Sequence, residues 1–181
     1  YLLTGDPRSK EIAGYMVQYI KTVCPPKKAF YAKKAKNFWT EREIAFPFLG
    51  ILSYYELTQD PSLLQLSHEY MDNLYTTQLQ WPDRGGFIHN LYAHDPEEGA
   101  RPDEYGGSPF MTGLLLEAVI KYHRLTNNEK AADSIYRALD WLIKEGLVAT
   151  KDSFRYLTAD QYASDEGAPD LNFLVVHAFG Y

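Results

Sequence analysis

Apolar side chains recur at helical spacing in three separate stretches of the chain. In residues 8–21, 62–78 and 128–144 they return every three or four positions, as they do on one face of an α-helix. Charged and polar residues fill many of the positions between them. We therefore predict three amphipathic helices that each bury one side.

Three other stretches are apolar on most sides. These are residues 46–57, 109–125 and 170–181, which are rich in Leu, Val and Phe. A helix that is hydrophobic all round is one that its neighbours cover on all sides. We expect these stretches to form inner helices and the amphipathic stretches to form outer helices. Pro47 stands closer to the end of its stretch than Pro109 does, so the second inner helix is predicted to be longer by more than one turn.

A short sequence motif joins an inner helix to an outer helix in three places. It reads Tyr-Leu-Leu-Thr-Gly-Asp-Pro at residues 1–7, Tyr-Glu-Leu-Thr-Gln-Asp-Pro at 55–61, and His-Arg-Leu-Thr-Asn-Asn-Glu at 123–129. Asp or Asn before the new helix is a good N-cap, and Pro is tolerated at the first helical position. A unit that recurs in this way predicts stacked helical hairpins joined by tight turns.

The connections from an outer helix to the next inner helix are long. They span residues 22–43, 79–107 and 146–169, and connections of this length usually serve a function. Because each begins at the same end of an outer helix, we expect all of them to meet at one rim, with the tight turns at the opposite rim. The inner helices would direct the positive ends of their dipoles toward this loop-rich rim.

This alternation of helices resembles the (α/α) toroid of the six-hairpin glycosidase-like proteins. The resemblance rests on the sequence motif at 1–7 and 55–61 and on Gly-Gly-Ser-Pro-Phe at 106–110, which leads into an apolar inner helix. It implies an all-α fold in which antiparallel helical hairpins form an arc of a toroid, as one domain over residues 1–181. The chain supplies about three hairpins and starts and stops within helical patterns, so we interpret it as part of a longer protein.

The amino-acid composition limits the classes of protein to which this chain can belong. A chain of 181 residues with 45% hydrophobic residues can bury one sizeable core. Its formal net charge of −6 argues against a nucleic-acid partner. We interpret the lysine-rich segment 27–36 as a solvated loop or as an amphipathic helix with lysines on its polar face. The longest apolar run is too short to span a bilayer, which argues against a membrane partner. Cys24 is the sole cysteine of the sequence, so no intrachain disulfide can form.

The connection 79–107 holds the densest set of chemically useful side chains. Its glycines would let the backbone approach a ligand closely. Glycoside hydrolysis needs two carboxyl groups across the scissile bond, and Asp103 or Glu104 is predicted to supply one of them. Acids of the other connections could supply its partner, namely Glu41, Glu43, Asp165 or Glu166. A lyase would instead need a base and donors that stabilise an enolate, chemistry that is offered by His89, Asn90, Tyr92 and His94.

Aromatic rings in the connections favour a saccharide ligand, because the C–H face of a sugar packs on them. The candidate substrate-binding residues are Trp39, Trp81, Tyr105 and His94, and the candidate catalytic residues are Asp103, Glu104, His89 and Tyr92. The many acids between His94 and Tyr105 would repel a polyuronate, so a neutral sugar is favoured. The sequence contains no metal-binding motif and no phosphate-cradling loop, so neither a metal nor a cofactor is expected.

We therefore predict a carbohydrate-active protein that binds a saccharide at the loop-rich rim and cleaves a glycosidic bond. One alternative is a polysaccharide lyase, and another is a sugar epimerase that would use His177, although we interpret this histidine as a hydrogen-bonded core residue. A third is a non-catalytic helical domain that packs against a second domain or the rest of its own toroid. The activity class alone favours a secreted or periplasmic location.

Overall fold

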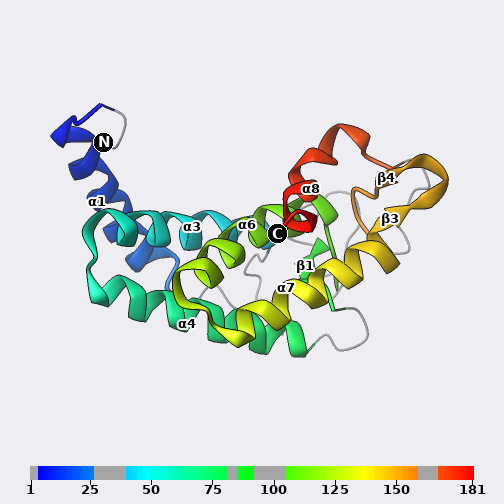
Figure 1. The fold of residues 1–181 in the computed structure, drawn as a ribbon, viewed down its shortest axis with the longest axis horizontal. Helices are drawn as coiled ribbons and strands as arrows, with labels where there is room; N and C mark the ends of the chain where they lie inside the picture. Colours follow the sequence, from blue (N-terminus) through cyan, green and yellow to red (C-terminus); the bar gives the residue numbers. More distant parts are fainter. Residues whose placement is uncertain (1–3, 27–39, 81–84, 92–104, 159–166) are drawn as a thin grey trace.

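The computed structural model describes residues 4–26, 40–80, 85–91, 105–158 and 167–181. Within these ranges the chain is predominantly helical, which confirms the predicted all-α fold class (Figure 1). The α-helices of the described ranges are α1 (Pro7–Val23), α3 (Glu41–Thr58), α4 (Pro61–Leu79), α6 (Pro109–Thr126), α7 (Glu129–Trp141) and α8 (Phe173–Phe179). None of them is long and apolar enough to cross a lipid bilayer.

The inner helices α3 and α6 pack side by side and run in the same direction (Figure 1). At their starts, the backbone N–H of Ser108 donates a hydrogen bond to the Glu41 carboxylate. Near their ends, Lys121 of α6 forms an ion pair with Glu56 of α3. The third predicted inner helix, α8, packs along α6. This contact is close, because a Cβ atom at Gly113 would lie 2.2 Å from a backbone oxygen of α8. The prediction that its neighbours cover α8 on all sides is wrong, because Phe173, Val176 and Phe179 are exposed and its buried residues are Val175 and Ala178.

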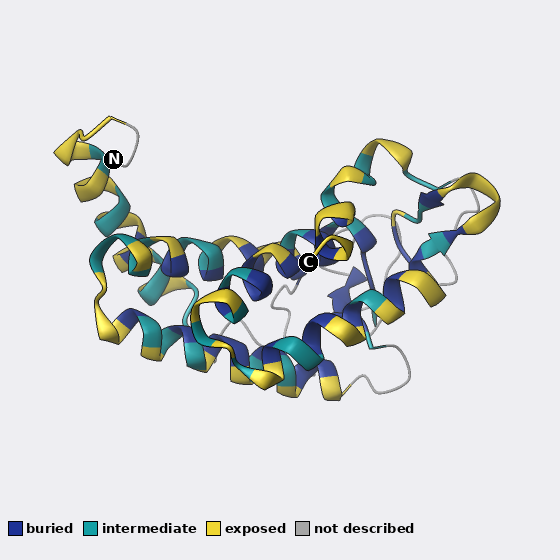
Figure 2. Cartoon of the chain, viewed as in Figure 1, coloured by how far each residue is buried: buried dark blue, intermediate teal, exposed yellow. Residues whose placement is uncertain are grey.

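The outer helices cover one side of this inner layer. α4 turns back along α3, α7 turns back along α6, and α4 and α7 pack against each other. The hydroxyl of Ser134 donates to Gln78 across the α4–α7 contact at 2.6 Å. Figure 2 shows buried residues on the facing sides of these helices and exposed residues on their outer sides. The predicted pairing of inner with outer helices is therefore present around α3, α4, α6 and α7.

The three tight turns share one backbone geometry. Each has a residue in the left-handed region, with φ of 69° at Gly5, 56° at Gln59 and 51° at Asn127. The next residue in each turn is the N-cap of the following helix, and its side chain accepts a backbone N–H of the first helical turn. These N-caps are Asp6, Asp60 and Asn128. The sequence repeat therefore corresponds to a repeated backbone conformation at the three turns.

The expected length difference between the inner helices is wrong. α3 and α6 both contain 18 residues. Pro109 begins its helix, but Pro47 lies inside α3, which starts earlier at Glu41. A proline inside a helix removes one backbone hydrogen bond. In α3, packing against α4 and α6 stabilises the helix through Pro47 in spite of this loss.

Short strands occur in the long connections, where the sequence predicted none. β1 (His89–Asn90) pairs antiparallel with β2 (Tyr105–Gly106), and β3 (Leu147–Val148) pairs antiparallel with β4 (Ser153–Phe154). Single helical turns accompany them: a π-turn that extends α7, and two 3-10 turns. These are Leu142–Gly146, Ala149–Lys151 and Pro169–Leu171.

Candidate functional site

The described parts of the long connections meet at one rim of the molecule. Thr158 of one connection exchanges hydrogen bonds with Gly107 of another, at 3.0–3.2 Å. His89 of the second connection contacts Glu41, where the first connection enters α3. In Figure 1 the strands gather at this rim, and the turns after α3 and α6 lie at the other end. The predicted loop-rich rim is confirmed for these residues.

A buried carboxylate joins three chain segments at this rim. Nδ1 of His89 lies 2.6 Å from Oε2 of Glu41, and the backbone nitrogen of Ser108 lies 2.9 Å from Oε1. An ionised carboxylate only accepts hydrogen bonds, so Nδ1 is the donor. The side chains of Glu41 and His89 are both 0% exposed. We name Glu41, His89 and Ser108 the Glu41 junction.

The local sequence explains the position of the Glu41 junction. Glu41 is the first residue of α3, and Ser108 is the N-cap of α6. Two helix N-termini therefore lie close together, and a negative charge is favourable there because the N–H groups and helix dipoles are oriented toward it. His89 reaches the carboxylate because β1 pairs with β2, which ends two residues before Ser108. The junction thus ties the second connection to the starts of both inner helices.

Most of the predicted site residues lie outside the described ranges. These are Trp39, Trp81, Tyr92, His94, Asp103 and Glu104, together with the partner acids Asp165 and Glu166. Of the other candidates, His89 belongs to the Glu41 junction, and Tyr105 is half-buried in β2. Partial desolvation raises the pKa of Glu43, and the positive charge of Arg42 offsets part of that rise. The catalytic and binding roles of these residues stay predictions.

The glycines of the second connection pack against a tryptophan. A Cβ atom at Gly86 would lie 2.4 Å from the Trp141 ring, and one at Gly107 would lie 2.3 Å from it. Trp141 itself is 2% exposed at the end of α7. Gly85 has φ of 69° and passes the backbone of Arg137. These glycines therefore allow close packing within the protein, where the sequence suggested close approach to a ligand.

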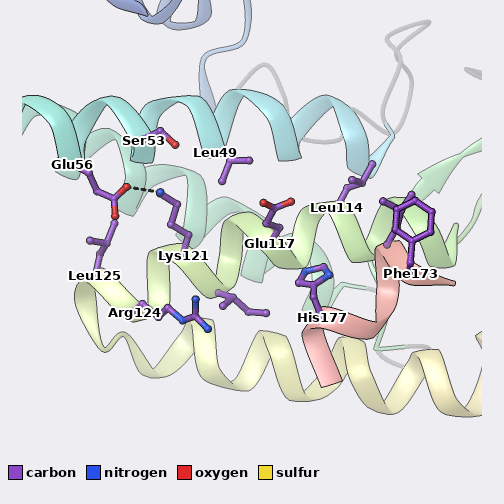
Figure 3. Close-up of a pocket in the computed structure, with 12 residues that line it drawn as sticks. Leu49, Ser53, Glu56, Leu114, Glu117, Lys121, Arg124, Leu125, Phe173 and His177 are labelled. Carbon is purple, nitrogen blue, oxygen red and sulfur yellow. Dashed lines mark ion pairs between the residues drawn. The ribbon is translucent and has the colours of Figure 1, made fainter. Parts of the chain in front are cut away.

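An open groove runs along the inner helices α3, α6 and α8 (Figure 3). Its volume is about 700 Å³. The lining carries two carboxylates and two cations among apolar side chains; the charged residues are Glu56, Glu117, Lys121 and Arg124. Phe173 and His177 of α8 close one side, as the close-up shows (Figure 3). This α3–α6–α8 groove is the candidate binding site that the described residues form.

The charges of the groove are partly paired. Lys121 and Glu56 form an ion pair across α6 and α3, and both remain accessible, with side chains 26% and 44% exposed. Arg124 lies 4.8 Å above the centre of the Tyr181 ring, a cation–π contact. Glu117 is exposed and makes no ion pair with any residue that the structure describes. It is therefore accessible to a ligand that donates hydrogen bonds.

Sequence reasoning missed this groove, although α6 carries a signal for it. Glu117, Lys121 and Arg124 follow one another at i, i+4 and i+7, so they form a charged stripe on an otherwise apolar helix. The interpretation of His177 as a core residue is wrong, because it is exposed and lines the groove. An apolar helix context indicated burial, but no helix of the described ranges covers the side of α8 that faces the groove.

Among the described residues, no group of three or more His, Cys, Asp and Glu side chains is arranged to hold a metal ion. Comparison with known proteins gives no match to any family model, curated protein or solved structure.

Proposed function

We propose that this protein is carbohydrate-active: it binds an oligosaccharide in the α3–α6–α8 groove, whereas the sequence predicted binding at the loop-rich rim, and it cleaves a glycosidic bond. The supporting observation is the groove itself. Its volume of about 700 Å³ lies within the range of about 300–1,000 Å³ that small-molecule sites usually have. The groove is open to solvent along the inner helices, so an oligosaccharide can enter it without a rearrangement of the protein.

The chemistry of the lining suits a sugar. The carboxylates of Glu56 and Glu117 can accept hydrogen bonds from hydroxyl groups, and Lys121 and Arg124 can donate to ring and hydroxyl oxygens. Phe173 is 70% exposed at the side of the groove and offers an aromatic face to the C–H face of a sugar ring. Because the two carboxylates balance the two cations, the groove favours a neutral saccharide over a polyanion.

The proposed cleavage step uses paired carboxylates. A hydrolase protonates the leaving oxygen with one carboxyl group and uses the other as a base or nucleophile. Asp103 or Glu104 is our candidate for one of these two carboxyl groups, and an acid of another connection is the candidate for its partner. His89 and Tyr92 are the alternative set for a lyase. The proposal for binding rests on the groove, and the proposal for cleavage rests on the resemblance, so they are tested separately.

A second candidate function is a non-catalytic helical domain. The observation that favours it is the complete burial of His89 in the Glu41 junction, where the imidazole supports the rim. A catalytic base must come within hydrogen-bond reach of its substrate. A domain that binds saccharide without cleaving it would retain the groove and need no such base.

Binding is tested by calorimetric titration of neutral gluco-, xylo- and manno-oligosaccharides, with a polygalacturonate oligomer as the anionic comparison. We expect a neutral oligosaccharide to bind, and Phe173→Ala to weaken that binding at least tenfold, or about 1.4 kcal/mol. The matched control is Tyr136→Ala, an exposed aromatic on the outer helix α7. If none of these sugars binds, or if Phe173→Ala binds like the wild type, the groove is not a saccharide site.

Cleavage is tested on whichever oligosaccharide binds. A hydrolase releases new reducing ends without ultraviolet absorbance, whereas a lyase leaves an unsaturated product that absorbs. We expect reducing ends that disappear in Asp103→Asn or Glu104→Gln while the oligosaccharide still binds. Binding without any cleavage by the wild type would favour the non-catalytic domain.

A further inference from the structure

The charged side chains of the α3–α6–α8 groove differ in whether they already have a partner. Lys121 and Glu56 form an ion pair, and Arg124 lies 4.8 Å above the centre of the Tyr181 ring. Glu117 forms no ion pair and accepts no side-chain hydrogen bond from any residue that the structure describes. The two carboxylates balance the two cations, but the charge that remains available to a ligand is negative.

The neighbours of Glu117 in the groove are mostly apolar. Leu114 and Ile120 lie one helical turn to either side of it on α6, and Leu49 lines the groove from α3. In Figure 3 the Glu117 side chain projects from α6 between Leu49 and His177 of α8. Apolar walls strengthen the attraction between charges, so a cation gains more from this carboxylate than from one on an open surface.

An ammonium group uses such a carboxylate better than a hydroxyl group does. A hydroxyl donates one hydrogen bond between a neutral and a charged group, whereas an ammonium brings three donors and an opposite charge. Phe173, which is 70% exposed at the side of the same groove, offers an aromatic face to a sugar ring. A free carboxylate and an exposed ring in one groove therefore suit an amino sugar, whose C–H face packs while its ammonium group pairs.

Given the proposed saccharide site, on which this inference rests, we propose that the groove prefers an oligosaccharide with one unacetylated amino sugar, its ammonium group paired with Glu117. Neutral oligosaccharides bind more weakly, with a hydroxyl in that place. The helical rise puts Lys121 about 6 Å and Arg124 about 10 Å farther along α6. These cations repel further ammonium groups in that direction, so a ligand with a single ammonium is favoured over a fully deacetylated one.

The first experiment compares tetramers of N-acetylglucosamine by titration calorimetry. The fully acetylated tetramer is the neutral reference, and four isomers that each lack one acetyl group carry a single ammonium at a known position. We expect one isomer to bind at least tenfold more tightly than the reference, and more tightly than the tetramer without acetyl groups. If no isomer exceeds the reference, the preference for an amino sugar is wrong. The titration of neutral gluco-, xylo- and manno-oligosaccharides decides separately whether the groove binds saccharide.

The second experiment tests whether Glu117 is the partner of the ammonium group. Glu117→Gln keeps the shape of the side chain and removes its charge, so the preferred isomer should bind about as weakly as the acetylated reference. Affinity for the reference itself should change little. The matched control is Glu69→Gln, an exposed glutamate on the outer helix α4, which should leave the preference intact. If Glu117→Gln retains the preference, or weakens every tetramer equally, the assignment to Glu117 is overturned.

The third experiment separates an amino sugar from a basic peptide, which presents the same ammonium group. The probe is a capped Gly-Ser tetrapeptide that contains one lysine. We expect it to bind at least tenfold more weakly than the preferred isomer, because it has no sugar ring to pack on Phe173. Phe173→Ala should weaken binding of the isomer and leave that of the peptide unchanged. A peptide that binds as tightly as the isomer overturns the proposal in favour of a peptide ligand.

Discussion

The Glu41 junction and the α3–α6–α8 groove each contain a glutamate and a histidine, but these residues are buried in the junction and exposed in the groove. Glu41 and His89 lie 2.6 Å apart and are fully buried. Glu117 and His177 line an open groove. A buried acid must find partners inside the protein, whereas an exposed acid is solvated and available to a ligand. Burial, more than residue type, therefore separates the residues that hold the rim together from those that can bind.

The largest effect is expected at the Glu41 junction. His89→Leu would leave the Glu41 carboxylate buried without its histidine partner, and leaving a buried acid without its partner in this way costs about 3–5 kcal/mol. The measurement is the free energy of unfolding from urea titration. Glu117→Gln, a change at the exposed acid of the groove, should alter stability by less than about 0.5 kcal/mol. Similar losses for both variants would remove the contrast between the two regions.

The next effect is expected at the glycines beneath the rim. Gly107→Ala places a methyl group against the Trp141 ring, and overpacking of this kind costs about 1–3 kcal/mol. Gly180→Ala is the control, because a Cβ atom there would have its nearest neighbour at 3.6 Å. Urea unfolding of both variants compares them directly. An unchanged midpoint for Gly107→Ala would show that Trp141 moves freely and that the rim is loosely packed.

A smaller effect on stability is expected in the groove. Lys121→Met removes a partly exposed ion pair with Glu56, and such pairs contribute about 0–1 kcal/mol. Oligosaccharide affinity should fall more clearly, because the ammonium group is also a donor to the ligand. Thermal unfolding and titration calorimetry on the same preparation separate the two. A large loss of stability with unchanged affinity would make Lys121 a structural residue.

The smallest effect is expected at a surface ion pair away from both regions. Hydrogen bonds from Arg137 and Tyr75 lower the pKa of Asp133. A carboxyl group with a lowered folded-state pKa stabilises the protein above its unfolded-state pKa of about 3.9, and this stabilisation is lost as the pH falls through the folded-state value.

Asp133→Asn should therefore lower the urea midpoint slightly at pH 7 and reduce its decline below about pH 4. Tyr75→Phe removes one of the two donors and should give an intermediate result. Identical pH profiles for all three proteins would show that this surface pair contributes nothing measurable to stability.

The helices and the tight turns between them were predictable because their signals are local. The Asp-Pro caps and the apolar periodicity lie within a few residues of the elements that they specify, and α3 and α6 each end at a Thr followed by a left-handed residue. The start of α3 was missed because Pro47 resembles a first-turn proline. It stands inside the helix, where tertiary packing outweighs the local preference.

The site was less predictable because it depends on distant residues. The sequence offered four partner acids, and nothing in it distinguished Glu41, which meets His89 from 48 positions away. Burial of that pair follows from the meeting of two helix starts, which is a property of the whole arrangement. The groove depends in the same way on which side of α6 and α8 remains uncovered, although the charged stripe of Glu117, Lys121 and Arg124 is visible in the sequence once the helix is known.

The peripheral position of α1 has a consequence for local unfolding. Among the described elements, α1 packs mainly on α3, whereas α6 packs against α3, α7 and α8. In arrays of stacked helices, stability is roughly the sum of each unit and its contacts with its neighbours. Amide protons of α1 should therefore exchange with solvent through partial opening, and those of α6 through global unfolding alone. Cooperativity would then decline from the middle of the chain toward its N-terminal helix.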